Sequence, residues 1–486
     1  MAKKVLYWHR SDLRLHDNEC LARACSEDNE ALPVYIYDER HYQMLDLGFR
    51  KTSHLRYRYL QDTLHDLREN YQKIGGDLLI RHGKPEEILP QLIAKYECDE
   101  LIFQKEIMSE ETEVESLLTE ELKSQPCKIT PIWGRTLYHI DDIPFEPAEV
   151  PLTSKTFRIN TSKATQPRAL FPIPERIDVI PLEDYGKLDW RPEIGFTDEE
   201  LATDYDADAF PAGETAALER LRYYTFDSEL LTNYKWTRNR SLGLDYSSKF
   251  SPYLAHGSLS PRQIYHTVKD YEDKVKKNRS TWWLVFEVVW RDYFSFLGLR
   301  FGDRVFYSGG YKGAKTDWKE DYDLFDRWKY GKTGIPFVDA HMYQLSRTGF
   351  MSNRGRVNTA SFFSRDYGVD WRWGAAWFES LLLDYDVCSN WFNWNTQALH
   401  MYYTNPLHQS LKYDKATEYI SSELDYLNKL PLAYRHAPWL LSDDELEELG
   451  IPRYKRPEEI YKKWTRSINN IQKLIDAKTE TITDNQ

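Results

Sequence analysis

Residues 77–106 read "DLLIRHGKPEEILPQLIAKYECDELIFQKE", and this stretch decides the fold of the first part of the chain. Its two apolar runs, "DLLIRHG" (77–83) and "ELIFQKE" (100–106), have the length of buried strands, and "PEEILPQLIAKY" between them has apolar residues at helical spacing. Further strand-like runs are "VLYWH" (5–9), "LPVYIYD" (32–38) and "KITPIWG" (128–134). This alternation predicts a doubly wound, Rossmann-like parallel α/β sheet over residues 1–140.

Such sheets bind ligands at the carboxyl ends of their strands. Neither a G-x-G-x-x-G motif nor a G-x-x-x-x-G-K-[ST] motif follows any of the predicted strands. The sequence therefore gives no support for a dinucleotide or nucleoside triphosphate site in this part.

The rest of the chain has a different character. Residues 141–203 are rich in proline and lack periodicity, which predicts an interdomain linker in the form of a long ordered crossover. Residues 204–486 contain a series of helical patterns, such as "STWWLVFEVVWRDYFSFLGLRF" and "GIPFVDAHMYQLSRTG". We therefore expect an N-terminal α/β domain (1–140), a linker (141–203) and a larger all-α domain (204–486).

Charge and cysteine usage limit the function classes. The net charge of −13 disfavours a nucleic-acid partner, yet residues 235–356 hold 22 Lys and Arg against 13 Asp and Glu, a local +9. This excess forms either a basic patch or an ordinary solvated face. The five cysteines lack C-x-x-C spacing, which favours a reducing compartment and argues against a metal site. No signal-like or membrane-spanning apolar run is present, so we expect a cytoplasmic protein.

Three polar stretches in the helical part carry the chemistry. "LDYDVCSNWFNWNTQ" (383–397) combines acids, amides and tryptophans in a way that predicts a pocket wall. "YSSKFSPYLAHGSLSPR" (246–262) offers hydroxyls, Lys249 and a helix start that suit a diphosphate, or form only a serine-rich cap. In "GFMSNRGRVNTASFF" (349–363), Arg354 and Arg356 need anions, for which Asp384 and Asp386 are candidates.

In this order the motifs resemble the photolyase/cryptochrome family, and within it the DASH-type cryptochromes. The resemblance extends over essentially the whole chain. Its carriers are "WHRSDLRLHDN" (8–18), the segment 246–262, "FEVVWRDYF" (286–294), "GKTGIPFVDAHM" (331–342), "TGFMSNRGR" (348–356) and "DWRWGAAWFESLLLDYDVCSNW" (370–391).

The resemblance implies a U-folded FAD in the helical domain and an antenna role for the α/β domain. The residues it assigns to FAD are Tyr234, Ser247, Ser248, Lys249, Phe250, Ser251, Arg291, Asn353, Arg356, Asp384, Asp386 and Asn390. Arg356 would pair with Asp384 beneath the flavin, and Asn390 would approach its N5. An amide cannot act as an acid there, so Asn390 would solvate N5 without supplying a proton.

The same resemblance implies an electron relay and a substrate contact. Trp394, Trp371 and Trp318 fall at the proximal, middle and distal relay positions; packing tryptophans are the simpler alternative. Glu287 and Trp290, at i and i+3 of one helix, match the contacts to a flipped-out cyclobutane pyrimidine dimer. The implied activity is a deoxyribodipyrimidine photolyase, a carbon–carbon lyase that uses reduced FAD and light, acting as a monomer on dimers in single-stranded DNA.

Several positions depart from the DASH pattern. Phe392 replaces a glycine, Thr396 an aromatic residue and Val357 a Gln or Met, within or near the altered stretch 395–414. These changes favour, as the alternative, a non-repairing blue-light photoreceptor that signals through flavin photoreduction. A third possibility, a hydride-transferring flavoenzyme, needs a nicotinamide site that the sequence does not show.

The resemblance also implies an antenna pigment. Glu106 stands where DASH-type proteins contact a folate (methenyltetrahydrofolate), or it is a surface acid at a helix start.

Overall fold

The computed structural model describes residues 2–26, 29–400, 403–451, 454, 457 and 462–483. These residues form two compact units. Unit 1 comprises residues 1–236, 248–307 and 379–392, and unit 2 comprises residues 237–247, 308–378 and 393–486. Part of the predicted helical domain thus belongs to the same compact unit as the sheet. No helix in the described part of the chain is long and apolar enough to cross a membrane.

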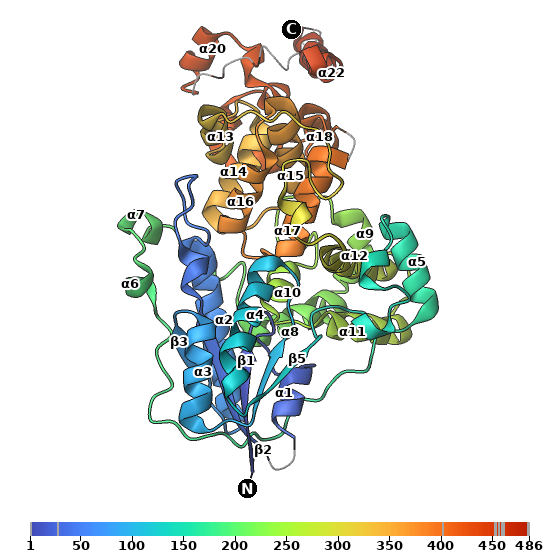
Figure 1. The fold of residues 1–486 in the computed structure, drawn as a ribbon. Coiled ribbons are helices and arrows are strands. Elements are labelled where there is room, and N and C mark those ends of the chain that lie inside the picture. Colours follow the sequence, from blue (N-terminus) through green and yellow to red (C-terminus); the bar gives the residue numbers. More distant parts are fainter. Residues whose placement is uncertain are drawn as a thin grey trace. The chain divides into compact units, whose positions relative to one another are not determined.

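Unit 1 is built on a five-stranded sheet (Figure 1). Its strands are all parallel in the order β3-β2-β1-β4-β5, which confirms the doubly wound prediction. The bounds are β1 Lys3–His9, β2 Asn29–Tyr37, β3 Leu79–His82, β4 Glu100–Gln104 and β5 Lys128–Ile132. The strand order reverses between β1 and β4, so the carboxyl ends of β1 and β4, with β2 next to β1, lie at the switch point where such sheets bind ligands.

Helices cover both faces of this sheet. Buried side chains of α1 (Glu19–Ala24) and α2 (His54–Lys73), such as Leu21 and Leu64, pack in one core cluster. Side chains of α3 (Pro85–Tyr96) and α4 (Ser109–Glu121), such as Leu89 and Leu118, pack in the other. The near-continuous apolar strands are explained by this burial on two sides.

The segment 141–203 contains more regular structure than its composition predicts. It holds α5 (Ser154–Ala164), which begins at Thr153, whose side chain accepts a hydrogen bond from the Thr156 backbone N–H at 3.3 Å. Phe157 of α5 is fully buried against Tyr293 and Phe296, at ring-centroid distances of 5.5 Å each. One buried aromatic residue fixes the helix on its neighbour, a contact that short polar helices need and that local sequence does not reveal.

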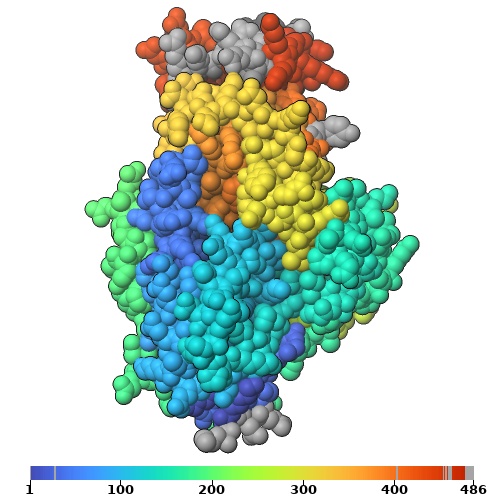
Figure 2. All heavy atoms as spheres, in the orientation of Figure 1, coloured from blue at the N-terminus to red at the C-terminus, as the bar shows by residue number. Residues whose placement is uncertain are grey.

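The helices of unit 1 that follow are α6 (Arg191–Ile194), α7 (Asp198–Leu201), α8 (Gly213–Arg222), α9 (Tyr234–Thr237), α10 (Ser251–His256), α11 (Pro261–Lys274) and α12 (Arg279–Phe301). α9 ends one residue beyond the boundary of the unit. The longest helix, α12, begins with a capping box in which Asn278 and Thr281 exchange side-chain and backbone hydrogen bonds. Figure 2 shows the α5 segment, in teal, at the surface of the molecule.

Unit 2 is helical throughout its regular structure. Its helices are α13 (Tyr322–Lys329), α14 (Pro336–Thr348), α15 (Asn353–Ser361), α18 (Pro406–Tyr413), α19 (Glu418–Glu423), α20 (Asp443–Glu448) and α22 (Thr465–Thr483). α16 (Trp371–Leu381) and α17 (Val387–Asn395) each contain a boundary between the units. "RGRVNTASFFSRDYG" (354–368), another helical pattern of the sequence, lies in α15 and in the π-helix Phe362–Tyr367 that continues it. A further helical pattern, "PEEIYKKWTRSI" (457–468), lies partly outside the described residues.

Candidate functional site

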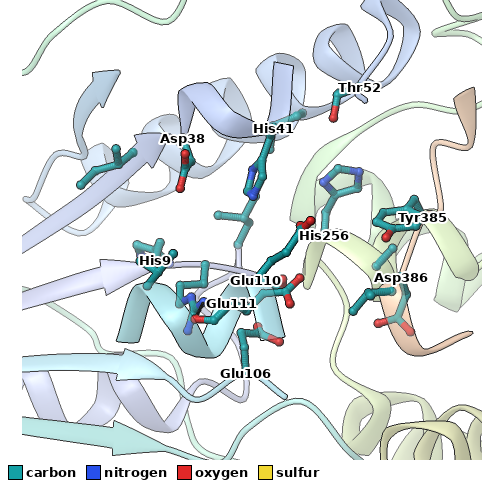
Figure 3. A pocket seen from close by; sticks show the side chains of 18 of the residues that line it. His9, Asp38, His41, Thr52, Glu106, Glu110, Glu111, His256, Tyr385 and Asp386 are labelled. Atoms are coloured by element: carbon teal, nitrogen blue, oxygen red, sulfur yellow. Dashed lines mark hydrogen bonds between the residues drawn. The ribbon is translucent and has the colours of Figure 1, made fainter. Parts of the chain in front are cut away.

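A cavity of about 200 Å³ lies in unit 1 at the carboxyl edge of the sheet (Figure 3). Arg10, Asp38 and Glu106, which follow β1, β2 and β4, line it together with His256 and Asp386 from the helical part. The cavity therefore lies at the switch point of the doubly wound sheet, where a ligand is expected.

A buried charge network forms one wall of this cavity. Arg135 donates hydrogen bonds to the carboxylates of Glu106 and Asp386, and its backbone oxygen accepts one from Arg291. The Arg291 guanidinium lies 4.0 Å from the Asp386 carboxylate. Burial pushes the pKa of Asp386 up, but Arg135 and Arg291 outweigh it and hold that pKa below its usual value. Asp386 is therefore an ionised carboxylate fixed by two cations.

Glu106 is not a surface acid at a helix start. Glu106 is 3% exposed, it lies three residues before the start of α4, and its second oxygen accepts a hydrogen bond from Gln104 at 3.1 Å. The simpler of the two interpretations of Glu106 is thus wrong, because the network with Arg135 draws this carboxylate inside.

The unsatisfied acid of the cavity is Glu111, which sequence reasoning missed. One oxygen of its carboxyl is buried without a hydrogen-bond partner among the described residues. Burial, and after it the charge of Glu106, raise the pKa of Glu111 to about 7. Burial lowers the pKa of His41 and of His256 to about 4, so both imidazoles are neutral at pH 7. A ligand with N–H donors would satisfy Glu111.

Tyr246 and Ser247 of the predicted phosphate segment (246–262) belong to unit 2, and its other residues belong to unit 1. Lys249 is 7% exposed and has φ +61°, a left-handed conformation that non-glycine residues seldom adopt and that marks functional turns. The carbonyl of Ser248 accepts a hydrogen bond from Arg220 at 3.0 Å. Tyr224 lies edge-on to both Tyr234 and Phe250, at ring-centroid distances of 6.3 and 5.9 Å. Ser251 is exposed at the first position of α10.

The start of α17 positions two of the predicted flavin contacts. Asp386 precedes the helix, and its carboxylate accepts a hydrogen bond from the Ser389 backbone N–H at 2.8 Å. The backbone N–H of Asn390 donates to the Asp386 carbonyl at 2.8 Å, and Asn390 is 8% exposed, as is Asp384. Acid and amide are thus held one helical turn apart in the same segment.

Phe392 belongs to the core of unit 1. It is fully buried and stacks on Phe294 at 6.0 Å with 13° between the ring planes. The large side chain at position 392, where the family has a glycine, is therefore accommodated by packing in the core.

The predicted dimer contacts lie on α12. The indole N–H of Trp283 donates to the Glu287 carboxylate at 2.8 Å, which fixes the orientation of that acid. Trp290 lies edge-on to Phe286 at a centroid distance of 6.1 Å and is half-buried. The hydrogen bond from Trp283 is a positioning contact that the sequence analysis did not identify.

Unit 2 holds the three predicted relay tryptophans. The indoles of Trp371 and Trp318 both donate to the carbonyl of Ser308, each at 3.0 Å, so one backbone oxygen brings the middle and distal positions together. Trp394 is 2% exposed, and its six-membered ring lies over Gly374, where a Cβ would approach Cη2 to 2.3 Å. Glycine is required at this helical position because Trp394 fills the space of a side chain.

Trp394 also contacts an aromatic cluster that the sequence analysis missed. Its ring centroid lies 5.9 Å from that of Trp328 and 5.1 Å from that of Phe378, both at 74°. Trp328 is fully buried and donates its indole N–H to the Thr359 carbonyl at 3.0 Å. Trp328 lies three residues before "GKTG" in the sequence, and that closeness was the available signal.

The predicted residues around α15 also lie in unit 2. Arg356 donates to the Met351 carbonyl at 2.9 Å, and Asn353 is exposed at the helix start. Arg354 donates to amide oxygens of Asn239 and Gln409, at 2.8 and 3.3 Å. The expectation that the charge of Arg354 needs a carboxylate is wrong, because two amides and the ring of a neighbouring tyrosine, 4.3 Å away, surround it.

Comparison with known proteins places these features in a family. Residues 5–175 match the family model of DNA photolyase, and residues 283–474 match that of the FAD binding domain of DNA photolyase. The chain is 41% identical to Cryptochrome DASH of Gloeobacter violaceus over 92% of this chain and 91% of that protein. The chain belongs to the photolyase/cryptochrome family.

Other photolyases and cryptochromes agree with this assignment. Cryptochrome DASH of Danio rerio is 40% identical over 96% of this chain and 92% of that protein. The crystal structure of a Synechocystis cryptochrome superimposes with a TM-score of 0.89 at 40% identity, covering 97% of this chain and 99% of that one. A class III photolyase from Agrobacterium tumefaciens gives a TM-score of 0.83 at 25% identity, over 97% and 98%. The predicted resemblance to DASH-type cryptochromes is confirmed, as is the presence of an FAD-binding domain.

Proposed function

We propose that this protein is an FAD-dependent photolyase of the DASH type that repairs cyclobutane pyrimidine dimers, with a preference for single-stranded DNA. The observation that carries the proposal is the oriented acid on α12. Trp283 holds the Glu287 carboxylate at 2.8 Å, one helical turn before the half-buried indole of Trp290. An acid that accepts hydrogen bonds beside an indole that stacks suits a flipped-out pyrimidine pair.

The residues present fit an FAD. A buried lysine in a strained turn, Lys249, suits a diphosphate, and the ionised Asp386 suits hydroxyl or N–H donors of the cofactor. Asn390 would turn its amide toward the flavin, and Arg356 would pair with Asp384. We propose the same cofactor contact for the remaining predicted residues: Tyr234, Ser247, Ser248, Phe250, Ser251, Arg291 and Asn353.

When bound and reduced, FAD supplies under light the single electron that the dimer needs, and the electron returns after the cyclobutane ring has opened. The chain's own residues supply position and charge. Glu287 would accept a hydrogen bond from the pyrimidines, Trp290 would stack on them, and the relay tryptophans Trp394, Trp371 and Trp318 would deliver electrons from the surface inward. The predicted domain ranges, cytoplasmic location and monomeric state form part of this proposal.

Repair should depend on both α12 contacts. We expect Glu287→Gln and Trp290→Ala each to lower light-dependent repair of a dimer in a single-stranded oligonucleotide by about tenfold or more, because one good contact contributes about 1–3 kcal/mol. The bound flavin should keep its absorption spectrum. Tyr307→Ala, which removes an aromatic side chain that is 60% exposed, serves as the control.

The experiment also tests the proposed function itself. Blue light, reductant and a dimer-bearing strand are combined, and restored thymines are measured in single-stranded and duplex substrates. Absence of repair in both, with flavin bound, would favour the alternative of a non-repairing photoreceptor. Thr396, which lies where the family has an aromatic residue, is the observation that keeps this alternative open.

We propose a folate as the antenna ligand of the cavity in unit 1. A folate carries N–H donors on its flat ring, and Glu111 is the half-buried acid of which one oxygen is buried there without a hydrogen-bond partner among the described residues; Glu106 would support that contact through the network with Arg135. Burial of an aromatic ring beside charged groups is typical of ligand cavities.

Folate binding should strengthen as pH rises from 6 to 8. An ionised Glu111 accepts N–H donors better than a protonated one, and its pKa of about 7 places the change within this range. Below that pKa, the apparent affinity for methenyltetrahydrofolate should fall by up to about tenfold per pH unit. The measurement is a titration followed by folate absorbance. In Glu111→Gln this pH dependence should vanish; an unchanged pH profile in that variant would contradict the assignment.

A further inference from the structure

Two exposed tryptophans, with half-buried rings and cations in contact with them, form a connected strip in unit 1. Trp236 is 70% exposed and Trp282 is 45% exposed, which is unusual for tryptophan. We name this surface the aromatic–cation strip; its residues are Arg158, Lys235, Trp236, Trp282, Trp283 and Phe286.

The strip is held together by ring stacking and cation–π contacts. Trp282 stacks on Phe286 with centroids 5.1 Å apart and 17° between planes, and Arg158 lies over both rings at 5.4 and 5.2 Å. Lys235 lies 4.7 Å from the ring of Trp236 and 5.3 Å from that of Trp283. Its backbone N–H donates to the Ser280 hydroxyl at 3.2 Å, which fixes α9 against the start of α12. Figure 1 shows α5 and α12 side by side.

The two cations of the strip have no carboxylate partner. Arg158 and Lys235 make no ion pair with any described residue, and the Nε of Arg158 is buried without a hydrogen-bond partner. In a protein with a net charge of −13, two unpaired cations over exposed rings mark a site for an anion. A ligand that matches both the rings and the cations is a polyanion that also carries flat aromatic groups able to stack.

The strip leads directly to the proposed dimer contacts. Phe286 lies edge-on to Trp290, and Trp283 donates its hydrogen bond to Glu287. Residues 282, 286 and 290 follow each other at i, i+4 and i+8 on α12, so they span ~12 Å along the helix axis at 1.5 Å per residue. About three stacked nucleotides cover that length at ~3.4 Å each.

We propose that the aromatic–cation strip binds the single-stranded DNA that flanks the lesion. Bases next to the dimer stack on Trp282 and Trp236, and their phosphates pair with Arg158 and Lys235. In a duplex the bases are already stacked on each other and paired, so their faces are not open to these rings. The strip therefore gives a physical origin for a preference for single strands, and it rests on the proposed function only in the identity of the lesion beside it.

The test is the binding of a dimer-free oligonucleotide to the FAD-loaded full-length protein. The variant Trp236→Ala/Trp282→Ala should weaken binding of the single strand by at least about tenfold, because the two lost stacking contacts together account for that much or more, and it should leave duplex binding nearly unchanged. Arg158→Gln should make the decrease of log affinity with log salt concentration less steep, by the amount that corresponds to about one phosphate contact. Flavin absorbance and the thermal unfolding midpoint verify that each variant is folded.

Tyr223→Ala is the matched control. Tyr223 is 40% exposed and carries Arg220 over its ring at 5.3 Å, as Trp282 carries Arg158, but it lies outside the strip. Loss of single-strand affinity in the strip variant and not in Tyr223→Ala supports the proposal. Equal affinity of wild type and strip variant, or no single-strand affinity in the wild type, overturns it. If the strip variant shows weaker single-strand binding but the wild type repairs no dimers, the proposed function is overturned, and the proposal that the strip binds single-stranded DNA is retained.

Discussion

Replacement of Arg135 by methionine is expected to lower the free energy of unfolding by about 3–5 kcal/mol. Methionine keeps much of the volume of arginine, so the loss comes from charge. Arg135 is 5% exposed and pairs with two buried carboxylates, Glu106 and Asp386. Without it, Glu106 loses its cation, and Asp386 keeps only Arg291 at 4.0 Å. Urea denaturation at pH 7 measures the change.

The pH dependence separates charge loss from simple loss of packing. In the wild type, Asp386 has a lowered pKa, so its ionisation stabilises the folded state above the unfolded-state pKa of about 3.9, and this contribution is lost as pH falls. The gap between wild type and Arg135→Met should therefore narrow as pH falls below about 4. A gap independent of pH would assign the effect to packing.

A matched control is the exposed pair of Arg191 and Asp189. The partners are 39% and 42% exposed, and Arg191→Met should change the free energy of unfolding by less than about 1 kcal/mol. The double variant Arg135→Met/Glu106→Gln should recover part of the loss, because one uncompensated charge is gone. An Arg135→Met protein as stable as Arg191→Met would contradict the importance of the network.

The sequence predicts the parts of this protein that local pattern determines. Strands buried on both faces appear as continuous apolar runs, and the doubly wound sheet follows from their alternation with helices. The charge network does not follow in this way, because Arg135 is 29 residues from Glu106 and 251 residues from Asp386. The one available signal was its position, three residues after β5, at the sheet edge where ligands bind.

Predictions for individual residues fail for a related reason. From the sequence, the large side chain of Phe392 in place of a glycine is expected to fill part of a pocket. In the structure it stacks on Phe294, a residue far away in the chain that the local sequence does not reveal. Likewise Glu111 is one of several acids in "SEETEVE", and its buried carboxyl oxygen distinguishes it from the exposed Glu110 and Glu113. The three-dimensional surroundings of such residues decide their chemistry, and the local sequence pattern does not contain this information.

Replacement of Trp394 by phenylalanine is expected to abolish nearly all light-driven reduction of the bound FAD. Phenylalanine is much harder to oxidise than an indole, so it cannot give up an electron at the first relay position. Trp394 is almost fully buried, and the rings around it include Trp328, Phe363 and Phe378. Of these three, Trp328 is the one that is readily oxidised. Absorbance of the flavin under blue light with an external reductant gives the rate.

Trp391→Phe provides the matched control on the same helix. Trp391 lies three residues earlier in α17, is half-buried, donates its indole N–H to Glu379 at 3.2 Å and packs edge-on to Phe306. This tryptophan has a structural contact for its polar atom, and its replacement should leave photoreduction close to the wild-type rate. Both variants should bind FAD and be reduced normally by dithionite in the dark, which excludes loss of the cofactor as the cause. Wild-type photoreduction in Trp394→Phe would remove Trp394 from the relay, and a loss in Trp328→Phe as well would extend the relay to the residue that the structure adds.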